Sequence, residues 1–209
     1  MKRLTHLLAC LALILPAAFA HGASFNCSKA SGSVESLVCK DPALTARDEK
    51  LEAIYKTASA KAKGTLATRL RQDQRSWIKG RNECWKANDT TWLTASWTVG
   101  SVKECVDAQY RMRTSELQAV WRLLPPQTLA YSCQNNPANE VVANFFATDP
   151  ATLRLERGDR TTTLWQVGAP SAGLYEGQNV SVVHQEQQLT LRLLDTTTGK
   201  TDALQCTPK

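Results

Sequence analysis

Six cysteines that follow an apolar N-terminal segment constrain this chain more than any other feature of its sequence. The chain has 209 residues and seven cysteines, of which the first, Cys10, lies within the apolar segment. The remaining six are Cys27, Cys39, Cys84, Cys105, Cys133 and Cys206. An even number of cysteines in an exported chain indicates disulfide bonds, although the sequence alone leaves their pairing open. Cysteine clusters also commonly bind zinc, but the sequence has no Cys-x-x-Cys pair to hold it.

The N-terminal segment has the three parts of a secretory signal peptide. Lys2 and Arg3 carry the positive charge, an apolar run follows at 7–15, and Ala18-Phe19-Ala20 is a cleavage site of small residues. We therefore expect residues 1–20 to be a signal peptide and the chain to be exported to the periplasm. No later apolar run approaches the length of a transmembrane helix, so we expect no transmembrane segment.

Cys10 introduces the alternative of a lipid anchor. A lipid-bearing cysteine stands after the apolar run of its signal, whereas most of this run follows Cys10. We therefore expect Cys10 to be removed with the signal and the chain not to be a lipoprotein.

The Pro125-Pro126 pair divides the exported chain into two units. Apolar residues recur at helical spacing before it, and short runs rich in Val, Thr, Leu, Phe and Trp alternate with turns after it. The fold class is therefore α+β with two domains: a small disulfide-bonded helical domain at 24–124, a linker at 125–130, and a small antiparallel β-sheet or barrel at 131–209. Four cysteines precede the prolines and two follow, so a Cys133–Cys206 bond would close the second domain upon itself. In the first domain we favour Cys27–Cys39 and Cys84–Cys105.

Local signals place the elements of both domains. Asp41 and Pro42 suit the cap and the first position of a helix, whose apolar stripe ends at Gly64-Thr65. A second helix is expected to end near Cys84, and a third at the two prolines. In the second domain, residues 157–160 and 197–200 are typical hairpin turns. The three leucines Leu189, Leu191 and Leu193 are spaced two apart, so they share one face of a strand.

A set of short phrases runs through the second domain in a defined order. They are Tyr131-Ser132-Cys133, Phe145-Phe146, Thr148-Asp149-Pro150, residues 155–160, residues 171–175, Asn179-Val180 and Cys206-Thr207-Pro208. With these phrases the domain resembles the MliC/PliC family of bacterial inhibitors of c-type lysozyme. The resemblance implies a c-type lysozyme as the protein partner. Residues 128–209 contain 6 Lys and Arg against 8 Asp and Glu, a sign of charge that suits a basic lysozyme.

In such inhibitors a Ser-Gly-x-x-Tyr loop supplies the inserting serine, and a lysine on the following strand supports it. Ser171 and Tyr175 match the pattern, while Ala172 stands at the glycine position and Gly173 follows at once. Gln185 stands at the lysine position. The resemblance thus implies lysozyme binding by Ser171, Ala172, Gly173, Tyr175 and Gln185. Val183 and Glu186 replace an aromatic residue and a glycine of the family pattern.

The first domain carries a second set of phrases. They are residues 25–30, Val34-Glu35, residues 39–44, Asp48, Leu51, Tyr55, residues 74–77, residues 81–84, Cys105, Tyr110, Arg113 and Glu116-Leu117. They resemble the N-terminal domain of LprI-type lysozyme inhibitors. Residues 24–127 contain 17 Lys and Arg against 11 Asp and Glu, which suits an anionic envelope polymer or simply a solvated helical surface.

Two groups in the first domain have both a functional and a structural interpretation. Asp48, Gln74, Arg75, Trp77 and Arg81 could form a polar binding site, but a buried carboxylate beside an arginine more often holds helices in register. Trp85, Trp92 and Trp97 could dock a partner or sugar rings, or pack beneath the Cys84–Cys105 loop. We favour the structural interpretation for both groups.

The sequence offers little for catalysis. Only His184 lies inside the exported chain beyond the expected N-terminus at His21, and the six cysteines are assigned to disulfides. There is no metalloprotease, phosphate-binding or dinucleotide-binding motif. We expect a periplasmic inhibitor of c-type lysozyme, not an enzyme, with no cofactor and no nucleic-acid partner. The alternative is an envelope-binding module without inhibition, whose ligand is peptidoglycan or another anionic cell-wall polymer.

Overall fold

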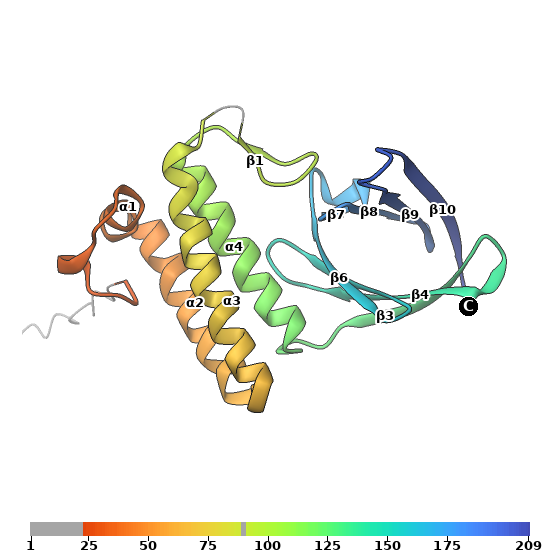
Figure 1. The fold of residues 1–209 in the computed structure, drawn as a ribbon, viewed down its shortest axis with the longest axis horizontal. Coiled ribbons are helices and arrows are strands. Elements are labelled where there is room, and N and C mark those ends of the chain that lie inside the picture. Colours follow the sequence, from red (N-terminus) through yellow and green to blue (C-terminus); the bar gives the residue numbers. More distant parts are fainter. Residues whose placement is uncertain (1–22, 89–90) are drawn as a thin grey trace, which may run out of the picture.

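The protein is described by a computed structural model that covers residues 23–88 and 91–209. A bundle of helices and an antiparallel β-barrel lie side by side, as Figure 1 shows. The predicted α+β class with two domains is therefore confirmed. The expected signal peptide at 1–20 lies outside the described residues.

The described residues of the helical domain form four α-helices and a disulfide-bonded loop. Its elements are η1 (Cys27–Lys29), α1 (Ser33–Lys40), α2 (Pro42–Lys61), α3 (Gly64–Asn82), η2 (Glu83–Lys86), the short strands β1 (Thr91–Trp92) and β2 (Thr98–Val99), and α4 (Val102–Val120). Asp41 caps α2 as predicted, because its carboxylate accepts hydrogen bonds from the amides of Ala43 and Leu44. Ser101 caps α4 in the same way through the amide of Glu104.

Helix α4 ends earlier than the prolines require. Arg122 adopts a left-handed φ of 45°. Its amide donates to the carbonyl of Ala119, and the amide of Leu123 donates to that of Gln118. This is the Schellman arrangement that usually uses glycine. The prediction that this helix ends at the prolines was therefore wrong by several residues, because Arg122 adopts the left-handed conformation that ends the helix.

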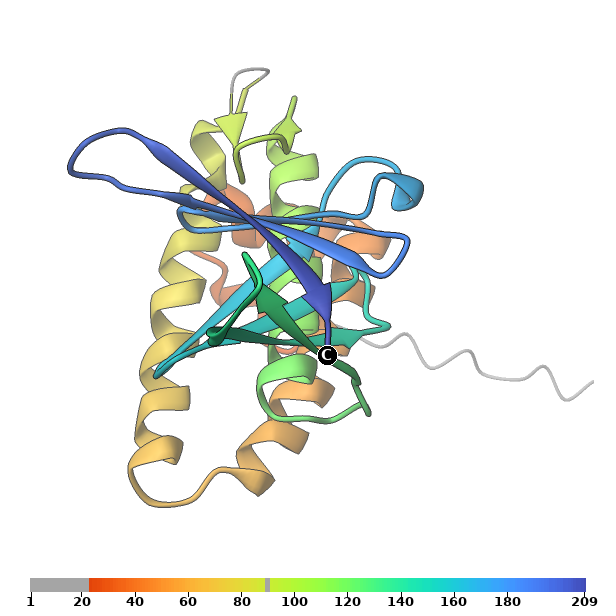
Figure 2. The ribbon, with the colours of Figure 1, turned by 90° about the vertical axis from the view of Figure 1, so that its right-hand side faces the viewer.

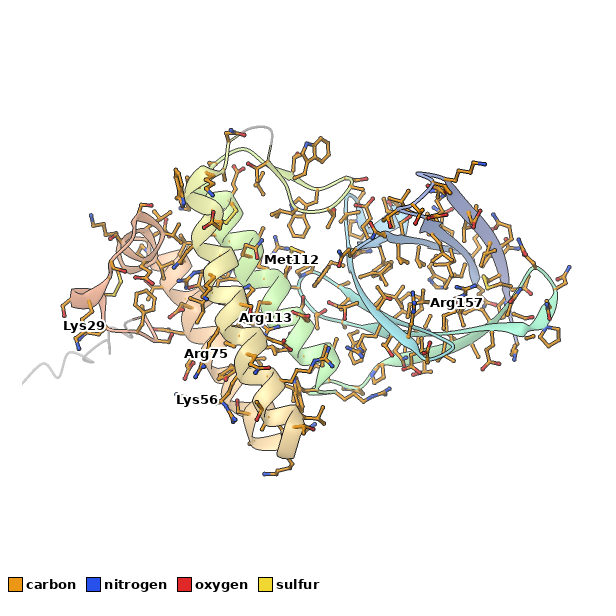
Figure 3. All side chains as sticks on the ribbon, viewed as in Figure 1. Lys29, Lys56, Arg75, Met112, Arg113 and Arg157 are labelled. Carbon is orange, nitrogen blue, oxygen red and sulfur yellow. A yellow bond between two sulfur atoms is a disulfide. The ribbon has the colours of Figure 1, made fainter. Side chains whose placement is uncertain are left out.

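A tyrosine connects the buried carboxylate and arginine of the helical domain. Arg81 Nη1 donates to Tyr110 Oη over 2.6 Å, and Tyr110 Oη donates to Asp48 Oδ1 over 2.8 Å. All three side chains are buried. Burial raises the pKa of Tyr110. Asp48 and Arg81 thus hold α2, α3 and α4 together, whereas Arg75 is exposed and takes no part (Figure 3).

The tryptophans of the disulfide loop do not form the expected cluster. Trp97 packs against the helical core, but Trp85 is 58% exposed and Trp92 is 63% exposed. The prediction that all three pack beneath the loop was therefore wrong for Trp85 and Trp92. The loop places its buried disulfide and Val99 against α4 and leaves these two indoles on the surface.

The second domain is a closed barrel of eight antiparallel strands in the order β10-β3-β4-β5-β6-β7-β8-β9. Its elements are β3 (Gln127–Cys133), β4 (Asn136–Phe146), β5 (Thr152–Arg157), β6 (Arg160–Gln166), η3 (Pro170–Ala172), β7 (Leu174–Gly177), β8 (Val180–Gln185), β9 (Gln188–Leu194) and β10 (Thr201–Pro208). The two predicted hairpin turns join β5 to β6 and β9 to β10. Leu189 and Leu191 are buried and Leu193 packs on the same core, which confirms their shared face.

Strand β3 begins before the position that we expected. Gln127 pairs with Phe145 and Ala130 with Val142 of β4, so residues 127–130 belong to the barrel and not to a linker. Pairing with β4 extends the strand because its partner runs on to Phe146.

The three favoured disulfides are all present, joining Cys27 to Cys39, Cys84 to Cys105, and Cys133 to Cys206. The third joins residues that face each other across β3 and β10, where the barrel closes. All six cysteines are therefore committed, as expected.

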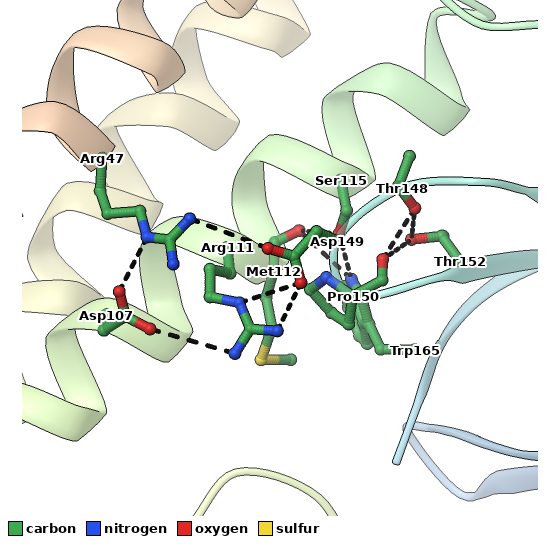
Figure 4. Close-up of polar contacts among 10 residues, drawn as sticks. All are labelled: Arg47, Asp107, Arg111, Met112, Ser115, Thr148, Asp149, Pro150, Thr152 and Trp165. Carbon is green, nitrogen blue, oxygen red and sulfur yellow. Dashed lines mark hydrogen bonds and ion pairs between the residues drawn. The ribbon is translucent and has the colours of Figure 1, made fainter. Parts of the chain in front are cut away.

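Side-chain contacts join the domains along α4. Trp165 of β6 donates from Nε1 to the carbonyl of Met112 and to Ser115 Oγ, over 3.2 and 3.1 Å. Arg111 Nη2 contacts Asp149 Oδ1 at 2.5 Å, and Arg47 Nη1 lies 3.8 Å from the same carboxylate (Figure 4). Figure 2 shows the barrel strands lying across the helices in the perpendicular view.

Candidate functional site

The expected inserting loop connects β6 to β7. Residues 170–172 form a single turn of 3₁₀ helix that begins with Pro170. The amide of Ala172 donates to the carbonyl of Ala169, and the amide of Gly173 to that of Pro170. Ser171 lies in this turn and its side chain is exposed. The loop thus presents a serine hydroxyl on a short, internally hydrogen-bonded turn.

Gly173 ends the turn at a position that only glycine can occupy. Its φ is 60°, in the left-handed region. A Cβ built there would lie 2.1 Å from the carbonyl oxygen of His184, and that oxygen belongs to the backbone of β8. The backbone freedom that the family pattern assigns to the position of Ala172 is therefore supplied one residue later.

Three hydrogen bonds hold the base of the loop. The amide of His184 donates to the carbonyl of Gly173 over 2.9 Å. Gln185 Nε2 donates to the carbonyl of Ala172 over 3.1 Å, and Gln166 Nε2 to that of Pro170 over 3.3 Å. The structure thus brings Gln185 together with Ala172 and Gly173, and the glutamine binds the loop backbone from the position where the family pattern has a lysine.

Tyr175 follows the loop and packs on the barrel. Its ring meets that of Phe145 edge to face, with centroids 5.7 Å apart. Phe145 in turn lies against His184 at 4.7 Å, and His184 Nε2 is 2.9 Å from Tyr131 Oη. Burial raises the pKa of Tyr175 and lowers the pKa of His184. Tyr131 and Phe145, which belong to the phrases of the family resemblance, thus support the strand behind the loop, a role that no sequence pattern indicated.

The helical domain also contacts β7 beyond this loop. Glu176 is 5% exposed, and its carboxylate accepts hydrogen bonds from the backbone amide of Ser96 at 2.8 Å and from Ser96 Oγ at 2.7 Å. Ser96 lies in the disulfide loop of the helical domain. The residue that follows Tyr175 is therefore fixed by the other domain, a link that neither domain's own sequence could reveal.

Two comparisons with known families place the chain in the lysozyme-inhibitor class. Residues 27–117 match the family described as "Lysozyme inhibitor LprI". Residues 131–198 match the family described as "Membrane-bound lysozyme-inhibitor of c-type lysozyme". The two families recur in the order that the sequence predicted.

The proteins called Lipoprotein LprI of Mycobacterium bovis and of Mycobacterium tuberculosis are each 30% identical to this chain over 155 residues. The aligned part covers 72% of this chain and 70% of each relative. The chain therefore belongs to the LprI family. No solved structure matches it.

These relatives change one expectation about attachment. They are named lipoproteins, and the second family is described as membrane-bound, so the comparisons do not support the expectation that the chain lacks a lipid anchor. Cys10 lies outside the described residues. None of the helices described within residues 23–88 and 91–209 has the length and apolar character of a membrane-spanning segment.

Proposed function

We propose that this protein is a periplasmic inhibitor of c-type lysozyme, and that it acts by inserting the turn at 170–172 into the enzyme's cleft. The observation that carries the proposal is an exposed Ser171 on a turn whose base is held by Gln166, His184 and Gln185. The names of both matched families support it. On this proposal the chain has no catalytic role of its own, and its activity serves to protect peptidoglycan.

The chemistry of the target explains why such a turn suffices. Lysozyme cleaves glycan with two carboxyl groups in its cleft, one as acid and one as nucleophile or stabiliser. The hydroxyl of Ser171 can donate to such a carboxylate while the turn blocks entry of the sugar. A loop that is already ordered loses less conformational entropy when it binds. The hydrogen bonds from Gln166 and Gln185 to loop carbonyls supply that order.

Titration of the protein against c-type lysozyme lysing bacterial cells tests the proposal, with g-type and i-type lysozymes alongside. We expect stoichiometric loss of c-type activity alone. Ser171→Arg is expected to abolish inhibition without unfolding the barrel, because a bulky cation replaces the inserting hydroxyl. Gln178→Arg is the matched control, since it adds the same charge at an exposed position beyond the other end of β7. Full inhibition by Ser171→Arg would remove the turn from the mechanism.

Gln185→Lys tests the support of the turn. A lysine at this position adds a cation near the target carboxylates, and a charge-assisted hydrogen bond contributes about 1.5–3 kcal/mol. We expect inhibition to become about tenfold to hundredfold tighter. Unchanged or weaker inhibition would show that the amide of Gln185 acts only through the carbonyl of Ala172.

One observation favours a second function, binding to the cell wall. Trp85 and Trp92 expose 58% and 63% of their surface on the disulfide loop, and Lys86 lies over the Trp85 ring at 5.2 Å. Exposed indoles are suited to stack on sugar rings or to dock a partner. Cosedimentation with purified peptidoglycan sacculi tests this function, with Trp85→Ala and Trp92→Ala against Leu194→Ala, an exposed leucine of the barrel. Equal sedimentation of all three variants would show that the two tryptophans do not bind peptidoglycan.

A further inference from the structure

A cleft of about 450 Å³ runs along the junction of the two domains. Helices α3 and α4 form one wall, and strands β5 and β6 form the other. Its volume lies in the range of small-molecule sites, which is roughly 300–1,000 Å³. Neither domain by itself has both walls.

A buried arginine in this cleft has an unused donor. Arg113 is 7% exposed; its Nε donates to Gln74 Oε1 over 2.9 Å and its Nη1 to Glu116 Oε2 over 2.8 Å. Its Nη2 is buried and has no hydrogen-bond partner in the described part of the chain. Figure 3 shows Arg113 between α3 and α4. A buried donor without a partner is costly, so an acceptor that enters from the cleft and reaches this nitrogen would be stabilising.

A second arginine lines the opposite wall. Arg154 of β5 makes no side-chain hydrogen bond or ion pair with any residue in 23–88 or 91–209. Burial lowers the pKa of Arg154, and the nearby charge of Arg122 acts in the same direction, against the carboxylates of Glu156 and Glu116. A bound anion would offset the cost of burying this positive charge. The two guanidinium groups, one from each domain, therefore line one cleft with unused donors.

The rest of the lining narrows the class of ligand. Asp73 and Glu116 also line the cleft, but each already faces an arginine: Arg69 at 3.9 Å and Arg113 at 2.8 Å. Their charges disfavour a ligand with two negative charges. Leu66 and Val120 line the same cleft and are 56% and 39% exposed, so apolar surface lies beside the arginines.

We propose that this interdomain cleft binds a carboxylate attached to a small apolar group. Arg113 and Arg154 hold the carboxylate, and Leu66 and Val120 contact the apolar part. This site is separate from the turn at 170–172 and goes beyond the proposed inhibition.

The test is an NMR titration of the isotope-labelled protein with hexanoate. Hexanamide lacks the charge, acetate lacks the apolar chain, and inorganic phosphate offers a different anion. We expect hexanoate to shift the signals of cleft residues and to bind more tightly than the other three. Arg154→Gln should weaken hexanoate about tenfold, the effect of losing one charge-assisted hydrogen bond. Arg157→Gln is the matched control, because Arg157 is an exposed arginine of the same strand that does not line the cleft (Figure 3).

A second variant separates binding from folding. Val120 is exposed, so Val120→Asp leaves the core intact while it places a negative charge on the apolar wall. We expect it to abolish hexanoate binding and to preserve the spectrum outside the cleft. The proposal fails if hexanamide or phosphate binds as well as hexanoate, if acetate does, or if no probe saturates. It also fails if Arg154→Gln and Arg157→Gln behave alike.

Discussion

The helical domain and the barrel are both small domains of an exported chain, and different interactions hold the core of each together. In the helical domain the backbone hydrogen bonds lie within each helix, so side chains decide how the helices pack. Three of the helices are joined by the buried hydrogen bonds from Arg81 to Tyr110 and from Tyr110 to Asp48. In the barrel the backbone itself joins the strands into a closed ring. The difference teaches that single polar side chains carry more of the tertiary structure in the first domain than in the second.

The disulfides extend this comparison. Those of the helical domain span sequence separations of 12 and 21, whereas the barrel disulfide spans 73. A longer closed loop restricts the unfolded chain more strongly. The barrel thus receives one long-range constraint at the seam between β3 and β10, and the helical domain receives two local ones.

The largest effect is expected from the barrel disulfide. Cys133→Ala with Cys206→Ala should lower the free energy of unfolding by about 4 kcal/mol, and the corresponding double variant of Cys84 and Cys105 by about 3 kcal/mol, since the loop-entropy term grows with the closed length. Urea denaturation measures the two losses, and hydrogen exchange assigns each to its domain. A larger loss for the shorter loop would mean that chain entropy does not govern this difference.

Tyr110→Phe tests the polar contacts that join the helices of the first domain. It removes the hydroxyl between Arg81 and Asp48 and leaves a buried carboxylate with one fewer donor, so we expect a loss of about 1–3 kcal/mol in the free energy of unfolding. Tyr175→Phe is the control, because the Tyr175 hydroxyl makes no hydrogen bond within the described residues. Thermal denaturation followed by circular dichroism measures both losses. Equal losses in the two variants would contradict a stabilising role for the Tyr110 hydroxyl.

Trp165→Phe tests how firmly the two domains are joined. The indole donates to Met112 and Ser115 of α4, and the loss of these bonds should cost about 1 kcal/mol. We expect hydrogen exchange to increase along α4 and β6, while the core of each domain stays protected. Trp92→Phe, an exposed change on the disulfide loop, should have no such effect. If both variants leave exchange unaltered, the ion pairs of Asp149 and the hydrogen bonds from Ser96 to Glu176 hold the domains without the indole.

The smallest effect concerns pH. His184 lies in the barrel, and it is the only histidine within the described residues. Burial holds its folded pKa below the unfolded value of about 6.5, so the unfolded state binds the proton more readily. Stability should therefore fall as pH drops through that value, in the barrel alone. His184→Gln should reduce the fall in melting temperature between about pH 7.5 and pH 5.5, and an equal fall in the variant would assign it elsewhere.

Much of the candidate site was predictable from the sequence, and its supports were not. The pattern from Ser171 to Tyr175 located the turn, and the left-handed backbone lies at Gly173, one residue after the position of the pattern's glycine. The turn is held by His184 and Gln185 of β8 and by Gln166 of β6. The hydrogen bonds to Glu176 come from Ser96, 80 positions away in the chain. No pattern within a few residues encodes such contacts.

The sequence by itself determined the two-domain class, the cap at Asp41 and the hairpin turns, because these depend on local backbone preference. It favoured the three disulfide pairs but left the pairing open, and the structure decided it. Tertiary structure alone decided that Trp85 and Trp92 are exposed, that Arg122 ends α4, and that Arg113 and Arg154 line one cleft. The physical reason is that burial and pairing depend on which distant surfaces pack against a residue, and that information lies in the whole fold.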